Sequence, residues 1–457
     1  MSTTRDERGR LLLGGVPLEE LARQPRVGTP AYVYDLDAMD AEARALTEAF
    51  DGAPHLVAYA VKANSAAPIV RSFARLGLGA DVVSGGELLL ALGAGIPADR
   101  VVMSGVAKSD EELDLALGAG DRGILAVQLE SVEEIARVAA RARALGRVAR
   151  VSLRVNPGLD PDELATHANI ATGHDEAKFG VPLARFGEAL AAAAARPELE
   201  LAGLSSHVGS QFVSTDAYER GAEVLFGLAR EALARGARLR TLDTGGGFGI
   251  DYGAGCPVRP VDFVRRVRAR ARAHGLEHLT HVVEPGRSLV GAHGVLLASV
   301  LQRKTDAPEG GEGGDGGERD EGAPEARRWL MIDAGMNDLM RPALYQANHR
   351  VASLGAPDGP SRAVRVVGPV CESSDDFGFH ALPARDLRPD AGHAGALAAV
   401  ALLDAGAYGF SMASRYNGRP LAAEVFLRGG RVVALRERAP LAAWAEEALA
   451  LREEPVS

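Results

Sequence analysis

The chain has 457 residues, 47% of them hydrophobic and 25% charged, a composition typical of a globular protein with enough core for two domains. Its formal net charge is −10, so nucleic acids and anionic membrane surfaces would be repelled, and a small molecule is the expected partner. Five of the first ten residues are charged and no apolar run is long enough to cross a membrane, which predicts a cytoplasmic protein.

Between about residue 55 and residue 287, short β-rich runs alternate with stretches rich in Ala, Leu, Glu and Arg that favour helices. This order is typical of parallel strands joined by crossover helices. The runs are LVAYAVKA, ADVVS, RVVMSG, GILAVQL, ARVSLRVN, LAGLSSHVGS, LRTLDTGGG and LTHVVEPGR. Eight βα units predict a TIM barrel over residues 30–290, with its functional residues at the C-terminal ends of the strands.

The first run places Lys62 inside an otherwise apolar stretch. A lysine at a strand end commonly lays its stem along apolar surface and extends its ammonium into water. The alternative is chemical, because an apolar pocket lowers the pKa of a lysine, and the resulting amine can form a Schiff base with pyridoxal phosphate. That hypothesis requires a phosphate-binding loop and a group for the pyridine nitrogen elsewhere in the chain.

Polar residues follow several later runs at the end where a barrel has its site. They are Ser84, Arg154, His207, Gly245, Gly246, Gly247, Glu284, Pro285, Gly286 and Arg287. The consecutive glycines allow backbone N–H groups to approach a phosphate, although a tight turn alone would also explain them. Glu284 could keep a pyridine nitrogen protonated and Arg287 could bind a substrate carboxylate, unless the two form a surface ion pair. His207 could lie against a cofactor ring, with Ser210 reaching the phosphate, or be structural.

After residue 290 the sequence consists of strands and turns without regular long helices. We expect a mainly β second domain over residues 291–457, completed by residues 1–29 and ending in a short amphipathic helix at 440–452. The stretch 306–326 is acidic, rich in glycine and nearly devoid of residues to bury, which predicts a disordered surface loop. Cys256 and Cys371 are too few for a disulfide framework, so each is a small core residue or a reactive thiol.

Seven strings of the sequence resemble, in the correct order, the diaminopimelate decarboxylase family, whose fold is that of alanine racemase. They are YAVKANS, HVGSQ, TGGGFGIDY, EPGRS, DAGMNDLMRPALY, GPVCESSD and DAGAYGFSMASRYNGRP, between about Tyr32 and Val425. The resemblance implies the decarboxylation of meso-diaminopimelate to L-lysine and carbon dioxide with pyridoxal phosphate as cofactor and no metal. It also implies a homodimer with shared active sites. The departures from the family pattern are the 306–326 insertion and the string SDDFGFH after the cysteine motif.

The resemblance also assigns roles to single residues. Lys62 would carry the cofactor, His207 would stack on its ring, and Glu284 would pair with its nitrogen. The cofactor would further contact Arg154, Ser210, Gly245, Gly246, Gly247, Pro285, Gly286, Arg287 and Tyr408. The substrate would contact Arg287, Arg341, Tyr345, Glu372 and Tyr408, and Cys371 would be the proton donor. The string HDEAKFGV, residues 174–181, resembles the family's short specificity segment.

Decarboxylases of lysine, ornithine or arginine with the same fold are the nearest alternatives. Arg287 and Arg341 would stay unpaired opposite the purely cationic tail of those substrates, so they favour a distal carboxylate, and Glu372 suits the distal ammonium. A racemase of this fold should lack a carboxylate on the ring nitrogen, and Glu284 argues against it. A non-catalytic binding module would need only the barrel.

Overall fold

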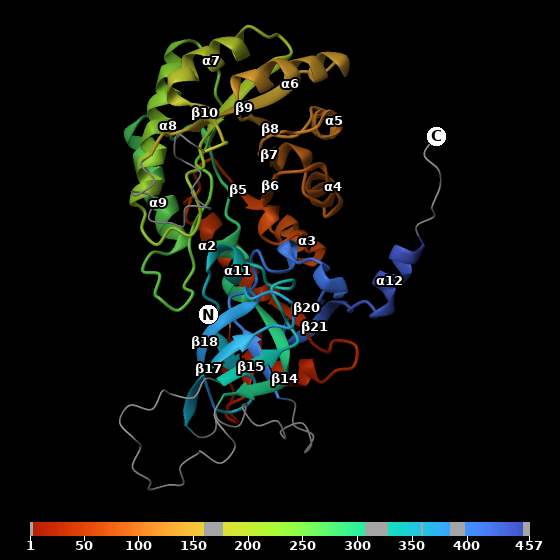
Figure 1. Cartoon of the computed structure of the whole chain (residues 1–457). Coiled ribbons are helices and arrows are strands. Elements are labelled where there is room, and N and C mark those ends of the chain that lie inside the picture. Colours follow the sequence, from red (N-terminus) through yellow and green to blue (C-terminus); the bar gives the residue numbers. More distant parts are fainter. Residues whose placement is uncertain (1–2, 160–176, 307–327, 358–359, 384–397, 451–457) are drawn as a thin grey trace. The chain divides into compact units, whose positions relative to one another are not determined.

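The computed structural model describes residues 3–159, 177–306, 328–357, 360–383 and 398–450. The chain divides into two compact units, of which the first comprises Met1–Asp37 with Ala292–Ser457 and the second Ala38–Gly291 (Figure 1). Residues 30–37, expected in the barrel, belong to the first unit because strand β4 (Ala31–Asp35) pairs with two of its strands. The predicted loop after Asp306 and residues 174–176 of the specificity segment lie outside the described residues.

The second unit is the predicted barrel of eight parallel strands. These are β5 (His55–Ala60), β6 (Gly79–Val82), β7 (Val101–Met103), β8 (Ala126–Leu129), β9 (Ala149–Asn156), β11 (Leu199–Ser205), β12 (Thr241–Asp243) and β13 (Thr280–Val283). Each pairs with the next in parallel and β13 pairs with β5, which closes the barrel. A short strand, β10 (Val181–Pro182), adds to β9 outside this ring. The eight β-rich runs therefore correspond one to one to the eight strands of the barrel.

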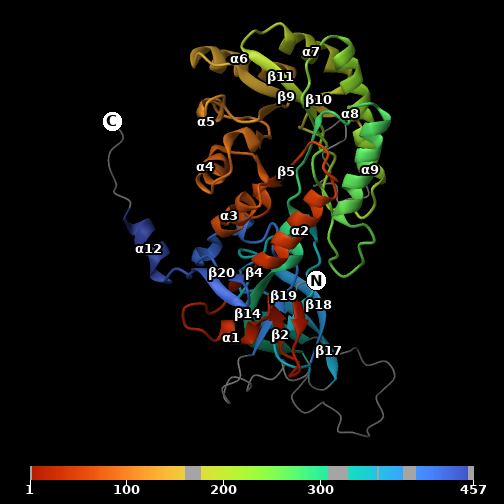
Figure 2. The same cartoon turned by 180° about the vertical axis from the view of Figure 1, so that it is seen from behind.

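Helices follow the strands and surround the barrel in both views (Figures 1 and 2). They are α3 (Ala67–Arg75), α4 (Gly85–Gly93), α5 (Asp110–Gly118), α6 (Val132–Ala144), α7 (Phe186–Ala194), α8 (Asp216–Ala234) and α9 (Pro260–Ala273), with α2 (Leu36–Glu48) before β5 and α10 (Arg287–Val290) after β13. Three begin at a serine, Ser84, Ser109 or Ser131, whose hydroxyl accepts a hydrogen bond from the backbone three residues on, at 3.2 Å in each case. Ser84, which stands among the polar strand-end residues, is thus a helix cap.

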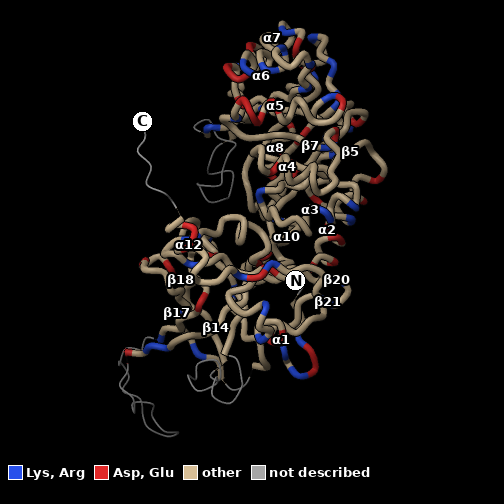
Figure 3. Tube along the Cα trace, turned by 90° about the vertical axis from the view of Figure 1, so that its right-hand side faces the viewer, with Lys and Arg blue, Asp and Glu red and all other residues tan. Residues whose placement is uncertain are grey.

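Acidic and basic residues both occur along the outer helices of the barrel (Figure 3). Arg137 of α6 donates to Asp110 of α5 at 2.6 Å, and Arg185 donates to Glu133 of α6 at 2.7 Å. Residues of opposite charge on neighbouring segments of the barrel therefore pair with one another. No helix in the described ranges combines the length and the apolarity needed to cross a bilayer.

The first unit is built around a mainly antiparallel sheet. Its strands run in the order β18 (Asp376–Pro383), β17 (Ser361–Val367), β15 (Arg328–Ile332), β14 (Gly294–Thr305), β4, β20 (Ala423–Arg428) and β21 (Arg431–Arg436), with β16 (Val351–Ser353) and β19 (Ala399–Leu402) joined to β14. The N-terminal segment forms β1 (Thr3–Arg5), β2 (Leu11–Leu13), β3 (Val16–Pro17) and α1 (Leu18–Ala22). Leu13 and Leu18 pack in one core cluster with Val295 and Val425, so this segment contributes to the core of the β unit. Near the C-terminus, α12 covers Ala442–Leu449.

Candidate active site

Lys62 lies in a single 3₁₀ turn, Val61–Ala63, directly after β5 rather than within the strand. Its ammonium is paired with the carboxylate of Asp81, a fully buried residue of β6 that also accepts a hydrogen bond from Ser104. About a third of the lysine side chain remains exposed. The structure therefore holds the amine against an acidic partner while leaving it accessible at the C-terminal end of the strand.

His207 follows β11 and accepts a hydrogen bond through Nδ1 from the backbone N–H of Gly246, at 3.2 Å. The same nitrogen lies 3.7 Å from Oε2 of Glu284. Burial and the nearby positive charges of Arg154 and Lys62 lower the pKa of His207 well below its ordinary value. The ring is therefore neutral near pH 7, and since Nδ1 accepts, its proton is on Nε2.

Glu284, at the end of β13, belongs to a buried group of polar side chains. The amide Nε2 of Gln128, on β8, donates to Oε1 of Glu284 at 2.9 Å and to Oδ2 of Asp243, the last residue of β12, at 3.0 Å. Burial, together with the charge of Asp243, raises the pKa of Glu284 well above its ordinary value. Burial also raises the pKa of Asp243, to about 6. The two carboxyl groups therefore do not both ionise readily.

The three glycines after β12 are required by the close packing of their loop. A Cβ on Gly246 would lie 2.0 Å from the carbonyl oxygen of Glu284, and one on Gly247 would lie 2.2 Å from that of Gly209. Gly245 and Gly247 also have φ values of 72° and 92°, in the left-handed region. Any side chain would push this loop away from the loops that follow β11 and β13, so the glycine run is more than a simple turn.

Arg287 and Ser210 are brought together beside this loop. Arg287 donates through Nη2 to the hydroxyl of Ser210 at 3.1 Å and through Nη1 to the hydroxyl of Tyr252 at 2.7 Å. The guanidinium and the serine hydroxyl are thereby placed together, an arrangement suited to anion binding. Pro285 and Gly286 complete the turn between β13 and α10 and are also buried.

Arg154, on β9, is a buried residue whose Nη1 donates to Oε1 of Glu130 at 2.8 Å. Glu130 also accepts from the backbone N–H groups of Gly105 and Gly180, at 2.8 and 2.9 Å. The guanidinium carbon of Arg154 lies 4.9 Å from the centre of the Phe179 ring. The described end of the specificity segment is thus tied to Arg154 through one carboxylate and one ring.

The remaining predicted residues belong to the β unit. Arg341 begins α11 (Arg341–Tyr345), is 5% exposed and donates to Nε2 of His349 at 2.7 Å. His349 in turn donates through Nδ1 to the carbonyl oxygen of Leu403 at 2.9 Å, which leaves Nε2 as the acceptor. Tyr345 ends α11 and is half-buried, as is Tyr408, whose φ is 55°.

Cys371 and Glu372 are exposed on a loop of the same unit, before β18. The backbone N–H of Cys371 donates to Oδ1 of Asn417 at 3.1 Å, and the hydroxyl of Tyr416 donates to Glu372 at 2.5 Å. Both partners come from the string SRYNG, residues 414–418, which precedes β20 in the chain. The loop is therefore held by this string, while the thiol and the carboxylate remain open to solvent.

Sequence reasoning missed four polar residues of the barrel that support the predicted ones: Asp81, Gln128, Glu130 and Asp243. Each lies in or directly after a strand whose other residues are buried. The signal in the sequence is an acid or amide inside an otherwise apolar strand. Asp81 in the run ADVVS shows it clearly.

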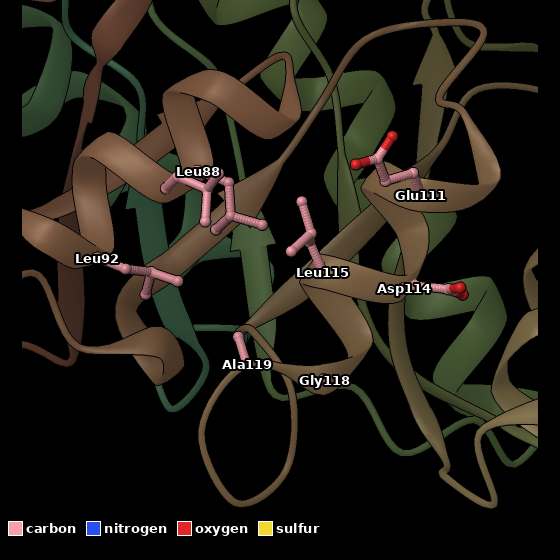
Figure 4. Close-up of a pocket in the computed structure, with 8 residues that line it drawn as sticks. Leu88, Leu92, Glu111, Asp114, Leu115, Gly118 and Ala119 are labelled. Carbon is pink, nitrogen blue, oxygen red and sulfur yellow. The ribbon is translucent and has the colours of Figure 1, made fainter.

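A groove of about 620 Å³ lies elsewhere, between α4 and α5 on the outside of the barrel (Figure 4). Leucines such as Leu88 and Leu115 line it together with Glu111 and Asp114. None of the residues described above contributes to it, so we locate the candidate active site from the polar cluster at the strand ends and not from this groove.

The donor set of the barrel cluster fits pyridoxal phosphate. Lys62 provides a primary amine for the aldehyde, and Glu284 provides a carboxyl group with high proton affinity for the pyridine nitrogen. The glycine loop, with Ser210 and Arg287 beside it, provides groups suited to a phosphate. The three kinds of group needed for this cofactor are thus present in one unit.

Comparison with known proteins gives the same identification. Residues 36–291 match the model of the pyridoxal binding domain of pyridoxal-dependent decarboxylases. The chain is 38% identical over 443 residues to the diaminopimelate decarboxylase of Zymomonas mobilis, covering 94% of each chain, and 39% identical over 438 residues to that of Pseudomonas aeruginosa, covering 96% of each. The crystal structure of diaminopimelate decarboxylase from Helicobacter pylori with L-lysine superposes with a TM-score of 0.82 at 36% identity, over 95% of this chain and 100% of that one. The chain belongs to the diaminopimelate decarboxylase family of pyridoxal-dependent decarboxylases.

Proposed function

We propose that this chain catalyses the decarboxylation of meso-2,6-diaminopimelate to L-lysine and carbon dioxide with pyridoxal phosphate as its cofactor, the last step of lysine biosynthesis. The observation that carries the proposal is the convergence of an amine, a high-affinity carboxyl and a glycine loop at the ends of β5, β13 and β12. The chain is 38 and 39% identical, over nearly its full length, to two enzymes of this name, which supports the same substrate.

Bound pyridoxal phosphate supplies an electron sink for the pair of electrons that the departing carboxyl group leaves behind. Lys62 would hold its aldehyde through Nζ, and Asp81 orients that amine. Glu284 would hold the ring nitrogen, and His207, kept neutral, would lie beside the ring without adding a positive charge. Gly245, Gly246, Gly247, Ser210 and Tyr408 would hold the phosphate, and Arg154, paired with Glu130, would support the region of His207 and Lys62.

The substrate would be selected through both of its ends. Arg287, Arg341 and Tyr345 would bind carboxylate groups, and Glu372 would bind the distal ammonium. A carboxylate is far better solvated than carbon dioxide, so a site that excludes water disfavours the ground state of the leaving group. After the carbon–carbon bond breaks, the thiol of Cys371 would deliver its proton to the carbon that keeps the electron pair, and a thiol suits this role because it is a better acid than a hydroxyl.

We further propose a two-fold homodimer in which Cys371 and Glu372 complete the site of the partner that contributes Lys62. The support is that both side chains are exposed on a held loop of the β unit, whereas the cofactor groups belong to the barrel. A proton donor must come within hydrogen-bond reach of the reacting carbon, and an exposed loop suits contact with a second subunit. The cytoplasmic location stays a prediction.

The test is a product assay on the enzyme supplied with pyridoxal phosphate. Purified protein incubated with meso-diaminopimelate should release lysine and carbon dioxide in equal amounts, while ornithine, arginine and lysine should be turned over much more slowly. The Lys62→Ala variant serves as the control for adventitious activity. A preference for lysine or ornithine as the substrate would contradict the proposal and favour a decarboxylase of another diamino acid.

A further inference from the structure

We propose that Gln128 and Asp243 are positioning residues for Glu284, so that a carboxyl pair held by one amide, and not Glu284 alone, balances the charge of a protonated pyridine nitrogen. The inference rests on the proposed function, since it concerns the cofactor nitrogen assigned there to Glu284.

The geometry leaves Gln128 a single arrangement. Gln128, Asp243 and Glu284 come from three different strands and are 2, 3 and 5% exposed. The –NH₂ group of Gln128 has two hydrogens, and two carboxylate oxygens accept them at 3.0 and 2.9 Å. Rotating the amide by half a turn would set its oxygen against both carboxyl groups, so the donor orientation is the stable one.

Asp243 is fixed from its other side. Its Oδ1 accepts a hydrogen bond from the backbone N–H of Gly245 at 2.9 Å, while Oδ2 faces Gln128. Its two oxygens therefore connect the glycine loop to the group around Glu284. An aspartate held in this way is a fixed negative charge behind Glu284 and not a side chain free to turn away.

The charges around the pair determine how many protons it holds. Burial raises the pKa of both groups, and the negative charge of Asp243 raises that of Glu284 further. Asp81 adds a negative charge that raises both pKa values, whereas Lys62 lowers that of Glu284 and Arg154 lowers that of Asp243. The two carboxyl groups therefore resist ionising together, whereas a protonated ring nitrogen beside Glu284 would favour the doubly ionised pair that accepts from Gln128.

Each partner has a distinct effect in this arrangement. Without the two N–H donors of Gln128, the doubly ionised carboxyl pair is buried with fewer hydrogen bonds. The carboxyl groups then keep a proton, and the ring nitrogen stays unprotonated. Without the charge of Asp243, the positive nitrogen loses one of its two counter-charges. Asp243→Asn would also turn an N–H towards one of the two donors that Asp243 faces, the backbone of Gly245 or the amide of Gln128, each of which needs an acceptor there.

The experiment compares the affinity of the apoenzyme for pyridoxal phosphate and for the analogue in which a C–H group replaces the ring nitrogen. The ratio of the two dissociation constants reports on the nitrogen alone, because the aldehyde and the phosphate are the same in both ligands. Glu284→Gln, which removes the carboxyl group itself, shows the largest reduction of this preference for pyridoxal phosphate that can be expected. We expect Gln128→Met and Asp243→Asn each to reduce the preference for pyridoxal phosphate by about tenfold, equivalent to one unit of pKa.

Gln211→Met is the matched control, since it removes an amide that bonds to the carbonyl oxygen of Ile250, at 2.7 Å, instead of a carboxyl group. It should leave the ratio unchanged. Equal weakening of both ligands by Gln128→Met and Asp243→Asn would show a merely structural role and overturn the inference, with the role of Glu284 intact. An unchanged ratio in Glu284→Gln would instead overturn the assignment of Glu284 itself, and the inference with it.

Discussion

The ammonium of Lys62 is paired with a buried carboxylate in the structure, so the aldehyde of the cofactor must replace an ion pair in order to reach the amine. The negative charge of Asp81 would also favour a protonated Nζ on Lys62 after the cofactor is attached. The lysine is thereby held in place before the cofactor binds. Another buried lysine of the barrel, Lys108, is bound to two carbonyl oxygens and Glu134 and has no such accessible amine.

Lys62→Ala should abolish covalent attachment of pyridoxal phosphate and nearly all lysine production, because Lys62 provides the accessible amine at the end of β5, beside Asp81. Borohydride reduction of the wild-type enzyme, followed by proteolysis and mass spectrometry, should place the cofactor on the peptide that contains Lys62. A reduced adduct on Lys108 in the variant, with turnover retained, would contradict the assignment.

His281 gives a prediction about stability and pH. It is buried with its ring perpendicular to that of Phe50, at 5.6 Å between ring centres, and its Nε2 lies 2.8 Å from the hydroxyl of Thr244. Burial lowers its pKa to about 3. Below pH 6.5 the unfolded chain takes up a proton that the folded chain does not, so this residue lowers stability progressively from pH 6.5 towards pH 3. At pH 5 the loss is about 2 kcal/mol.

Urea unfolding at pH 7.5 and pH 5 measures this effect. His281→Gln removes the titration, and the difference in unfolding free energy between the two pH values should shrink by about 2 kcal/mol. His278→Gln, a histidine on the exposed surface nearby, is the matched control and should keep the wild-type difference. The same difference in wild type and His281→Gln would mean that His281 does not stay neutral in the folded state.

At the scale of secondary-structure elements, Glu130, which directly follows β8, connects the segment after β7, strand β9 and the specificity segment. It accepts from Gly105 after β7, from Arg154 on β9, and from Gly180 in the specificity segment. Because Arg154 and Glu130 are both buried, the loss of one partner leaves the other charge without compensation. The specificity segment therefore depends on a side chain that lies outside it.

Glu130→Gln should lower the free energy of unfolding by about 3 kcal/mol, the usual cost of breaking a buried ion pair. It should also increase hydrogen exchange at the amide of Gly180, which loses its carboxylate acceptor. Glu133→Gln breaks an exposed pair with Arg185 and should leave both quantities unchanged. Exchange at Gly180 that is the same in Glu130→Gln and wild type would show that the segment is held by other contacts.

The sequence predicts the strands of the barrel well because each is a short apolar run followed by a helix with a clear start, as at Ser109 and Ser131. The position of Lys62 is less predictable, since its run reads as one strand through Ala63, yet β5 ends at Ala60. The pairing of Asp81 with Lys62, and of Gln128 with Asp243, joins residues of different strands. Such pairs depend on closure of the barrel, which no local pattern encodes.

At the scale of the whole molecule, a shared active site predicts complementation between two inactive variants. Lys62→Ala and Cys371→Ala should each be nearly inactive. Refolding an equal mixture should give about half heterodimers, and each heterodimer would contain one intact site of two, so about a quarter of the wild-type activity should return. A mixture that stays inactive although mass spectrometry shows heterodimers would indicate that each site lies within one chain.

Strand β4 pairs with β14 on one side and with β20 on the other, so residues 31–35 need residues 423–427 as neighbours. During synthesis on the ribosome, the barrel can close once residue 291 has emerged, whereas β4 must wait for almost the entire remaining chain. Until then its apolar residues, such as Val33, have an unpaired edge that other nascent chains could bind. We therefore expect the β unit, and not the barrel, to depend on chaperones during synthesis. Release from the ribosome should be slow at the C-terminal strands of that unit.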